Sequence, residues 1–155
     1  MDIISAKEGV FMVEQDTIKL LRECDSGVKM GVSAIDEVMD HVKSQDLRNI
    51  LQKSMTENET MKNELQSILV DYHDDGKDPN AMAQGMSWFK TNMKLSMSDN
   101  DSTVADLITD GCNMGIKSLS RYLNKYSAAD ERSKDMAKRL ISAEERLAAD
   151  VRPFL

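Results

Sequence analysis

Apolar side chains recur along this chain at alternating steps of three and four residues, over four separate stretches. The first two stretches run from Ile18 to Val42 and from Leu47 to Tyr72, and the last two run from Val104 to Tyr126 and from Ala137 to Phe154. This spacing places the apolar side chains on one face of an α-helix and is typical of the seam between packed helices. The pattern therefore predicts four long helices.

Turn and capping residues separate the four stretches. Gly76 is expected to end the second helix in a left-handed conformation, and Pro79 is expected to open a shorter helix. The polar run at 98–102 is a turn and cap cluster before the third long helix. The candidate N-caps are Asp16 or Thr17 for the first helix and Ser44 or Asp46 for the second.

These boundaries predict one domain over residues 1–155, because a chain of 155 residues suffices for a sizeable single core. Its parts are an N-terminal arm, a first helical hairpin, a crossover helix and a second helical hairpin. The expected ranges are 1–12, 16–75, 79–98 and 102–152. The fold class is all-α: an up-down four-helix bundle of two hairpins joined by a helical crossover, which is the ferritin-like architecture.

A pair of glycines spaced by four residues occurs in each hairpin. Gly27 and Gly31 lie in the first long helix, and Gly111 and Gly115 lie in the third. Glycine inside a helix costs about 0.5–1 kcal/mol relative to alanine, so two per helix indicate a steric need. We interpret them as a notch for close helix packing. The alternative is a pocket for a small ligand.

A polar layer is expected inside the bundle, formed by Asp25, Asn58, Glu144 and Tyr122. Di-iron bundles supply one Glu from each of two helices and a Glu-x-x-His motif from each of the other two. That motif is absent from this sequence, whose two histidines lie near predicted helix ends. We therefore expect no metal and no cofactor. An atypical carboxylate site is kept as an alternative, with Asp25, Asp110 and Glu144 as its candidate ligands.

Composition excludes several functional classes. The net charge of −7 is a poor match for nucleic acid or an anionic membrane, and no apolar stretch approaches membrane-spanning length. The N-terminus lacks the pattern of a signal peptide. Cys24 and Cys112 are interpreted as buried, reduced thiols, so we expect a cytoplasmic location. The sequence contains no nucleophile elbow and no phosphate-binding loop, and we expect no enzymatic activity.

Several short pieces of sequence resemble a known family. The block from Leu47 to Pro79, which contains Asn63-Glu64-Leu65-Gln66 and Gly76-Lys77-Asp78-Pro79, is similar to the second helix of an uncharacterised bacterial ferritin-like family. Trp88, Lys90 and Tyr122 follow in the same order. Bacterial spore-coat bundles are similar as well. The resemblance implies a ferritin-like bundle. Members of the family have acidic residues near the positions that Gly27, Gly31, Gly111 and Gly115 occupy here. Because this sequence has glycine at those positions, the resemblance implies no metal ligands.

The sequence thus predicts a non-enzymatic structural or interaction protein that lacks the di-iron ligand set. We expect a homo-oligomer or a protein partner, with contacts through the apolar arm at 1–12 or through the helix that contains Trp88. The alternatives are a metalloprotein with an atypical carboxylate site and a small-ligand carrier with a glycine-lined interior.

Overall fold

The computed structural model describes residues 3–79 and 99–155. These residues form four long α-helices: α1 (Ile3–Met39), α2 (Gln45–Asp71), α4 (Asp101–Lys125) and α5 (Glu131–Val151). A short 3-10 helix, η2 (Arg152–Phe154), follows α5. No strand occurs in the described ranges. The predicted all-α class and helical bundle are confirmed. The predicted crossover helix lies outside the described residues, apart from Pro79.

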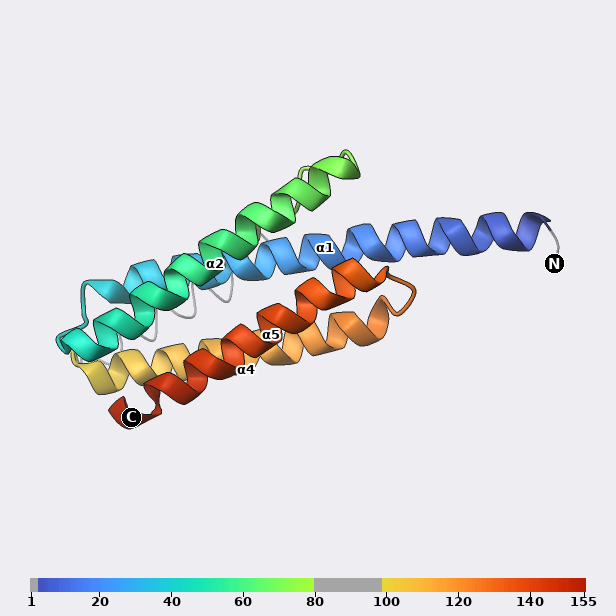
Figure 1. Ribbon diagram of the computed structural model, residues 1–155. Coiled ribbons are helices and arrows are strands. Elements are labelled where there is room, and N and C mark those ends of the chain that lie inside the picture. Colours follow the sequence, from blue (N-terminus) through green and yellow to red (C-terminus); the bar gives the residue numbers. More distant parts are fainter. Residues whose placement is uncertain (1–2, 80–98) are drawn as a thin grey trace.

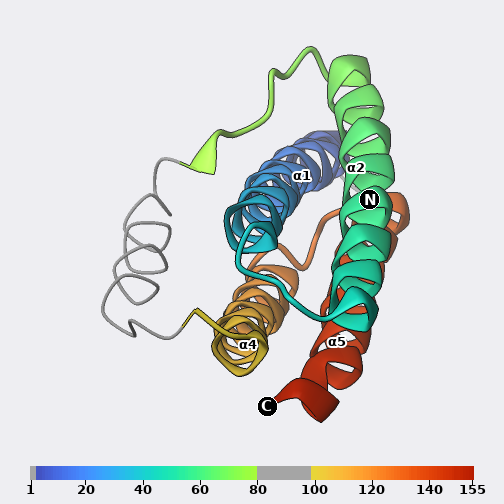
Figure 2. The same ribbon diagram turned by 90° about the vertical axis from the view of Figure 1, so that its left-hand side faces the viewer.

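The four helices form a bundle of two antiparallel hairpins, α1 with α2 and α4 with α5 (Figure 1). In the perpendicular view the helices occupy four corners, and α1 lies beside α4 (Figure 2). The helix α1 also contacts α5, and α2 contacts α5. The helix α2 ends at the opposite end of the bundle from the start of α4 (Figure 1).

The predicted seams are buried, and they form two apolar clusters at different levels of the bundle. One cluster includes Ile35, Leu51, Ile108 and Leu147. The other includes Val28, Met61, Leu119 and Leu140. Burial of such side chains contributes about 1.5–3 kcal/mol each relative to exposure, so the two clusters hold the hairpins together.

The helix starts of α2 and α4 agree with the sequence, because the polar run at 98–102 contains Asn100, the N-cap of α4. Other helix ends differ. Ser44 is the N-cap of α2, and its hydroxyl accepts a hydrogen bond from the Leu47 N–H at 3.3 Å. Asp16 and Thr17 do not cap the first helix, because α1 begins at Ile3 and continues through both. Their side chains instead accept hydrogen bonds from the backbone N–H groups of Ala128 (3.0 Å) and Asp130 (2.8 Å), which tie the α4–α5 connection to α1.

The end of α2 is also earlier than predicted. The helix stops at Asp71, with Tyr72 as its C-cap and His73 in the left-handed region at a φ of 55°. Gly76 has a φ of 83° as predicted, but it lies in an extended segment beyond the helix. A cap needs a left-handed residue next to the last helical turn, and His73 occupies that place.

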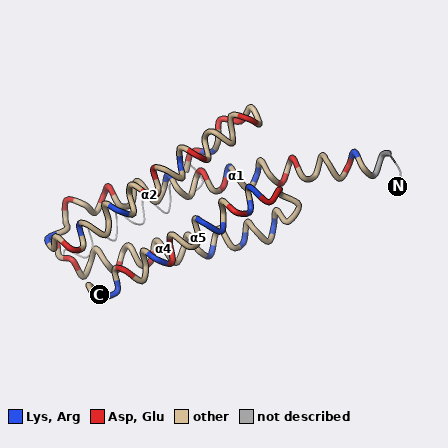
Figure 3. Tube along the Cα trace, in the orientation of Figure 1, with Lys and Arg blue, Asp and Glu red and all other residues tan. Residues whose placement is uncertain are grey.

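Charged residues of both signs are interspersed along all four helices (Figure 3). None of the described helices combines the length and the apolar character that would be needed to cross a bilayer.

Candidate functional site

A groove between α1 and α4 contains a cavity of about 60 Å³. All four glycines of the predicted notch line it: Gly27 and Gly31 from α1, and Gly111 and Gly115 from α4. The groove lies at the level where the two apolar clusters meet, with Val28 and Leu140 of one cluster and Ile35 and Leu147 of the other in its walls.

The surroundings of each glycine show what the missing side chains make room for. A Cβ atom on Gly27 or Gly111 would meet nothing within 4 Å. A Cβ on Gly31 would lie 3.4 Å from Asn58 Nδ2, and one on Gly115 would lie 3.4 Å from the Glu144 carboxyl. The neighbours are therefore open space and polar side chains, and no backbone of an adjacent helix is among them. This geometry favours the pocket interpretation over close helix packing.

Glu144 of α5 carries the carboxyl group that reaches the glycine-lined layer. The residue is half-buried, because it faces the cavity while its carboxyl is surrounded by protein. Burial raises the pKa of Glu144 to about 7, although a hydrogen bond from the Cys112 thiol acts in the opposite direction. The thiol of Cys112 is itself buried, and its pKa is raised by that burial and by the neighbouring Glu144. A thiol is a weak donor and leaves most of the carboxyl's bonding capacity unused.

Two further members of the predicted polar layer line the same cavity. Asn58 of α2 is buried, and Tyr122 of α4 is half-buried and stacks on Tyr126. Burial raises the pKa of Tyr122, and a hydrogen bond with Glu23 raises it further. Three of the four residues expected in the polar layer thus share one site.

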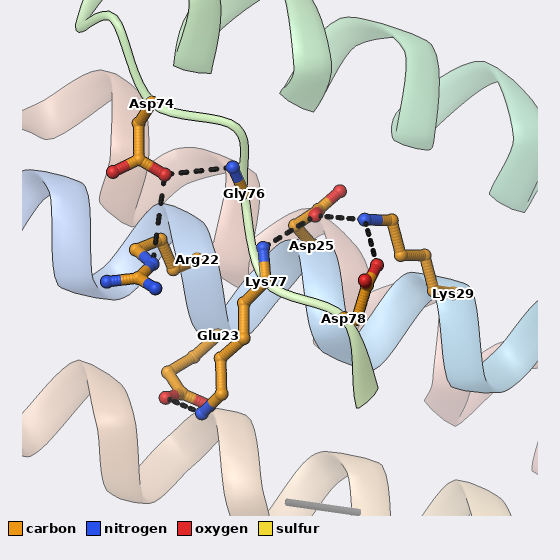
Figure 4. A network of polar contacts seen from close by, with 8 residues as sticks. All are labelled: Arg22, Glu23, Asp25, Lys29, Asp74, Gly76, Lys77 and Asp78. Carbon is orange, nitrogen blue, oxygen red and sulfur yellow. Dashed lines mark hydrogen bonds and ion pairs between the residues drawn. The ribbon is translucent and has the colours of Figure 1, made fainter. Parts of the chain in front are cut away.

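The fourth member, Asp25, lies outside this cavity. It binds the segment that follows α2, a contact that the sequence did not predict. Its carboxylate is fully buried, and Oδ2 accepts hydrogen bonds from the Lys77 N–H at 3.1 Å and from Lys29 Nζ at 2.7 Å (Figure 4). Lys29 also contacts Asp78 at 3.4 Å. We call residues 74–78 the strap, since they run across α1 after α2 has ended (Figure 4).

The ends of the strap are held by further polar contacts. Asp74 accepts a hydrogen bond from the Gly76 N–H at 2.8 Å and contacts Arg22 Nε at 3.7 Å. Lys77 Nζ lies 2.6 Å from Glu23 Oε1 (Figure 4). The strap thus pairs the charge of Glu23 through Lys77 Nζ, whereas the charge of Asp25 is paired by Lys29 of α1. Asp25 Oδ1 is buried and has no hydrogen-bond partner among the described residues.

The candidate metal ligands are not brought together. Asp25 pairs with Lys29 under the strap, Glu144 lies in the groove, and Asp110 is exposed on α4 near Asp106. Within the described residues, no group of three or more His, Cys, Asp or Glu side chains could hold a metal ion. The three carboxylates therefore cannot act as one coordination shell.

A second feature lies at the N-terminal end of α1, which extends past the other helices (Figure 1). Residues 6–15 are all exposed, and four consecutive ones are large and apolar. Their exposed fractions are 70% for Val10, 59% for Phe11, 57% for Met12 and 42% for Val13. Consecutive residues point in different directions around a helix, so this segment is apolar on several sides.

A larger hollow of about 530 Å³ lies on the surface between α2 and α5, but it is a weaker candidate. Its four charged side chains pair with one another. Arg139 donates two hydrogen bonds to Glu64, and Arg146 donates one to Glu57. Salt bridges of this kind at an exposed surface account for these charges without a ligand.

Sequence reasoning missed Glu23, Cys112 and the strap lysine, Lys77, as parts of these polar sites. Cys112 follows Gly111 directly, and this adjacency to the glycine pair is a signal that places it near the notch. Cys24 and Cys112 are both free and buried, as expected, and they belong to different apolar clusters. Neither Glu23 nor Lys77 carries a local signal, because their contact depends on the path of the strap.

The fold and the site define an all-α four-helix bundle with a glycine-lined groove and a projecting helix end. No protein-family model, no curated protein and no solved structure matches this chain.

Proposed function

We propose that this chain is a non-enzymatic interaction protein, a ferritin-like bundle without the di-iron ligand set that self-associates in the cytoplasm. The observation that carries the proposal is the run Val10-Phe11-Met12-Val13, which is exposed on the projecting end of α1. A run of four exposed, consecutive apolar residues is a liability in a monomer unless it has a use.

The energetics of a lone helix support a contact at this place. Residues 6–15 lie on a helix end that none of the other described helices covers, and they include Gly9. An isolated helix of this length is marginal in water, and an interior glycine weakens it further. Burial of Phe11 and its apolar neighbours in an interface would contribute about 1.5–3 kcal/mol per side chain.

A second copy of the chain is the partner that fits best. Two such helix ends can pair antiparallel about a two-fold axis, which closes the assembly as a dimer. A pairing centred between Val10 and Phe11 would place Lys7 of one copy opposite Glu14 of the other. Opposite charges at the rim of an interface favour this register. Free thiols at Cys24 and Cys112 are consistent with a cytoplasmic location.

The test is the mass of the full chain in solution, measured by sedimentation equilibrium over a dilution series. We expect a dimer for the unaltered chain and a monomer for the double variant Val10→Ser, Phe11→Ser. The matched control is Val70→Ser, which removes another exposed apolar side chain, 66% exposed, from α2. A monomeric unaltered chain, or equal dimerisation of all three proteins, would contradict the proposal.

A further inference from the structure

The cavity beside Glu144 has the features of a ligand site that the self-association proposal does not use. Its walls combine apolar side chains, such as Ile35, Ile108 and Leu147, with the open surfaces of the two glycine pairs. A water molecule needs about 10–15 Å³ of such space, so a cavity of about 60 Å³ has room for roughly four to six water-sized groups. A compact aliphatic molecule of about four or five non-hydrogen atoms matches this room.

The charge of the cavity indicates the sign of the guest. Among the described residues that line it, Glu144 and Glu23 are acidic and none is Lys, Arg or His. Glu23 is paired with Lys77 of the strap. Within residues 3–79 and 99–155, the Glu144 carboxyl accepts its hydrogen bond from the Cys112 thiol, a weak donor. A buried carboxylate without a cation is costly, and a cationic guest would relieve that cost.

We propose that this groove binds a small organic cation, a primary alkylammonium, whose ammonium group pairs with the Glu144 carboxylate and whose alkyl body lies between the two glycine pairs. An ammonium group has three N–H donors. Glu144 accepts one or two of them, and the side-chain carbonyl of Asn58 in the same cavity is a further acceptor. A neutral alcohol of the same length fills the space without this charge pairing, and an alkyl carboxylate is repelled.

Binding should depend on pH in a defined direction. The groups that face Glu144 are Cys112 of α4 and the uncharged Asn58 of α2, and Glu23 of α1 and Tyr122 of α4 line the same groove. Burial raises the pKa of Glu144 to about 7, so the carboxylate needed by the guest is the minor form at lower pH. The dissociation constant should therefore be about tenfold larger at pH 6 than at pH 8, since it is inversely proportional to the ionised fraction of Glu144.

The experiment is a titration of the full, isotope-labelled chain with n-butylammonium chloride at about pH 8 and about pH 6, followed by amide chemical shifts. The amides of Gly31 and Gly115 report directly on the cavity. We expect saturable shifts at these glycines for butylammonium, with a Kd on the order of 1 mM. We expect at least about tenfold weaker binding of n-butanol and of butyrate.

Two variants with a matched control complete the test. Glu144→Gln keeps the size of the side chain and should weaken butylammonium binding at least about tenfold while removing its pH dependence. Gly115→Val should fill the cavity and abolish binding, whereas Gly9→Val, at an exposed glycine with nothing within 4 Å, should bind as the unaltered chain does. Absence of saturable shifts, equal binding of the alcohol and the amine, or full binding by Glu144→Gln would overturn the proposal.

Discussion

At the scale of single residues, the surroundings of Glu144 give its carboxyl a proton affinity that a glutamate in water does not have. The carboxyl lies among two glycines, a buried amide and a buried thiol, and burial raises its pKa to about 7. A group whose pKa is raised in the folded state binds its proton more tightly there than in the unfolded chain. Glu144 therefore makes folding less favourable at every pH at which the unfolded carboxyl is ionised.

Replacement of this carboxyl should change how stability depends on pH. Below about pH 4.5 both states are protonated, and the effect is absent. Between about pH 4.5 and about pH 7 the unaltered chain should lose stability, by up to about 3 kcal/mol, and the loss should persist above that range. Glu144→Gln should remove it. The measurement is the free energy of unfolding by urea across this range, and a constant difference between the two proteins would contradict the assignment.

At the scale of elements, the strap shows how a segment without regular structure is held in place. Its backbone N–H at Lys77 is bonded to the buried Asp25, and its Gly76 passes so close that a Cβ would lie 2.3 Å from Asp25 Oδ2. Gly76 also has a φ of 83°, a conformation that side chains disfavour. Glycine is required here for two independent reasons.

A comparison of two glycine-to-alanine changes tests this requirement. Gly76→Ala should lower the free energy of unfolding by about 1–3 kcal/mol, because of the disfavoured φ and the collision with Asp25. Gly111→Ala, in a helix and with nothing within 4 Å, should instead raise it by about 0.5–1 kcal/mol. Chemical denaturation measures both. If Gly76→Ala were as stable as the unaltered chain, the described path of the strap would be wrong.

At the scale of the whole molecule, polar contacts fasten the two hairpins to each other at both ends of the bundle. At one end, Asp101 at the start of α4 accepts hydrogen bonds from the backbone of Lys43 at 2.7 Å and of Ser44 at 2.9 Å. At the other end, Thr17 accepts one from Asp130, whose side chain caps α5. These contacts join residues far apart in the sequence, and the apolar clusters lie between them.

Loss of one such fastening should destabilise the whole fold. Thr17 is fully buried, and Thr17→Val would leave the Asp130 N–H without its acceptor, at a cost of about 1–3 kcal/mol. Thr109→Val is the matched control, because the Thr109 hydroxyl donates to the Ala105 carbonyl of its own helix. Its effect should stay within about 0.5 kcal/mol. Thermal and urea unfolding would detect the difference, and equal effects would argue against the fastening role.

The sequence by itself determined the four helices, the seams that bury them and an N-cap at Ser44 or Asp46, of which the structure uses Ser44. These are local properties, since periodicity and capping depend on residues a few positions apart. It also placed Asn58, Tyr122, Glu144 and the glycines in one layer, because the spacing of each helix sets the height of its residues. The expected cap at Asp16 or Thr17 was wrong because nothing local stops α1 there, and both side chains serve a distant connection instead.

Only the tertiary structure decided what the space beside the glycines contains and where Asp25 finds its partners. Glycine spacing is the same whether a helix or a cavity lies opposite, and the distance between α1 and α4 is set by packing of the whole bundle. The position of Asp25 in the seam correctly indicated burial, but its contacts depend on a strap that begins about fifty residues later. The exposure of Val10 to Val13 likewise follows from where the other helices end, which no local pattern records.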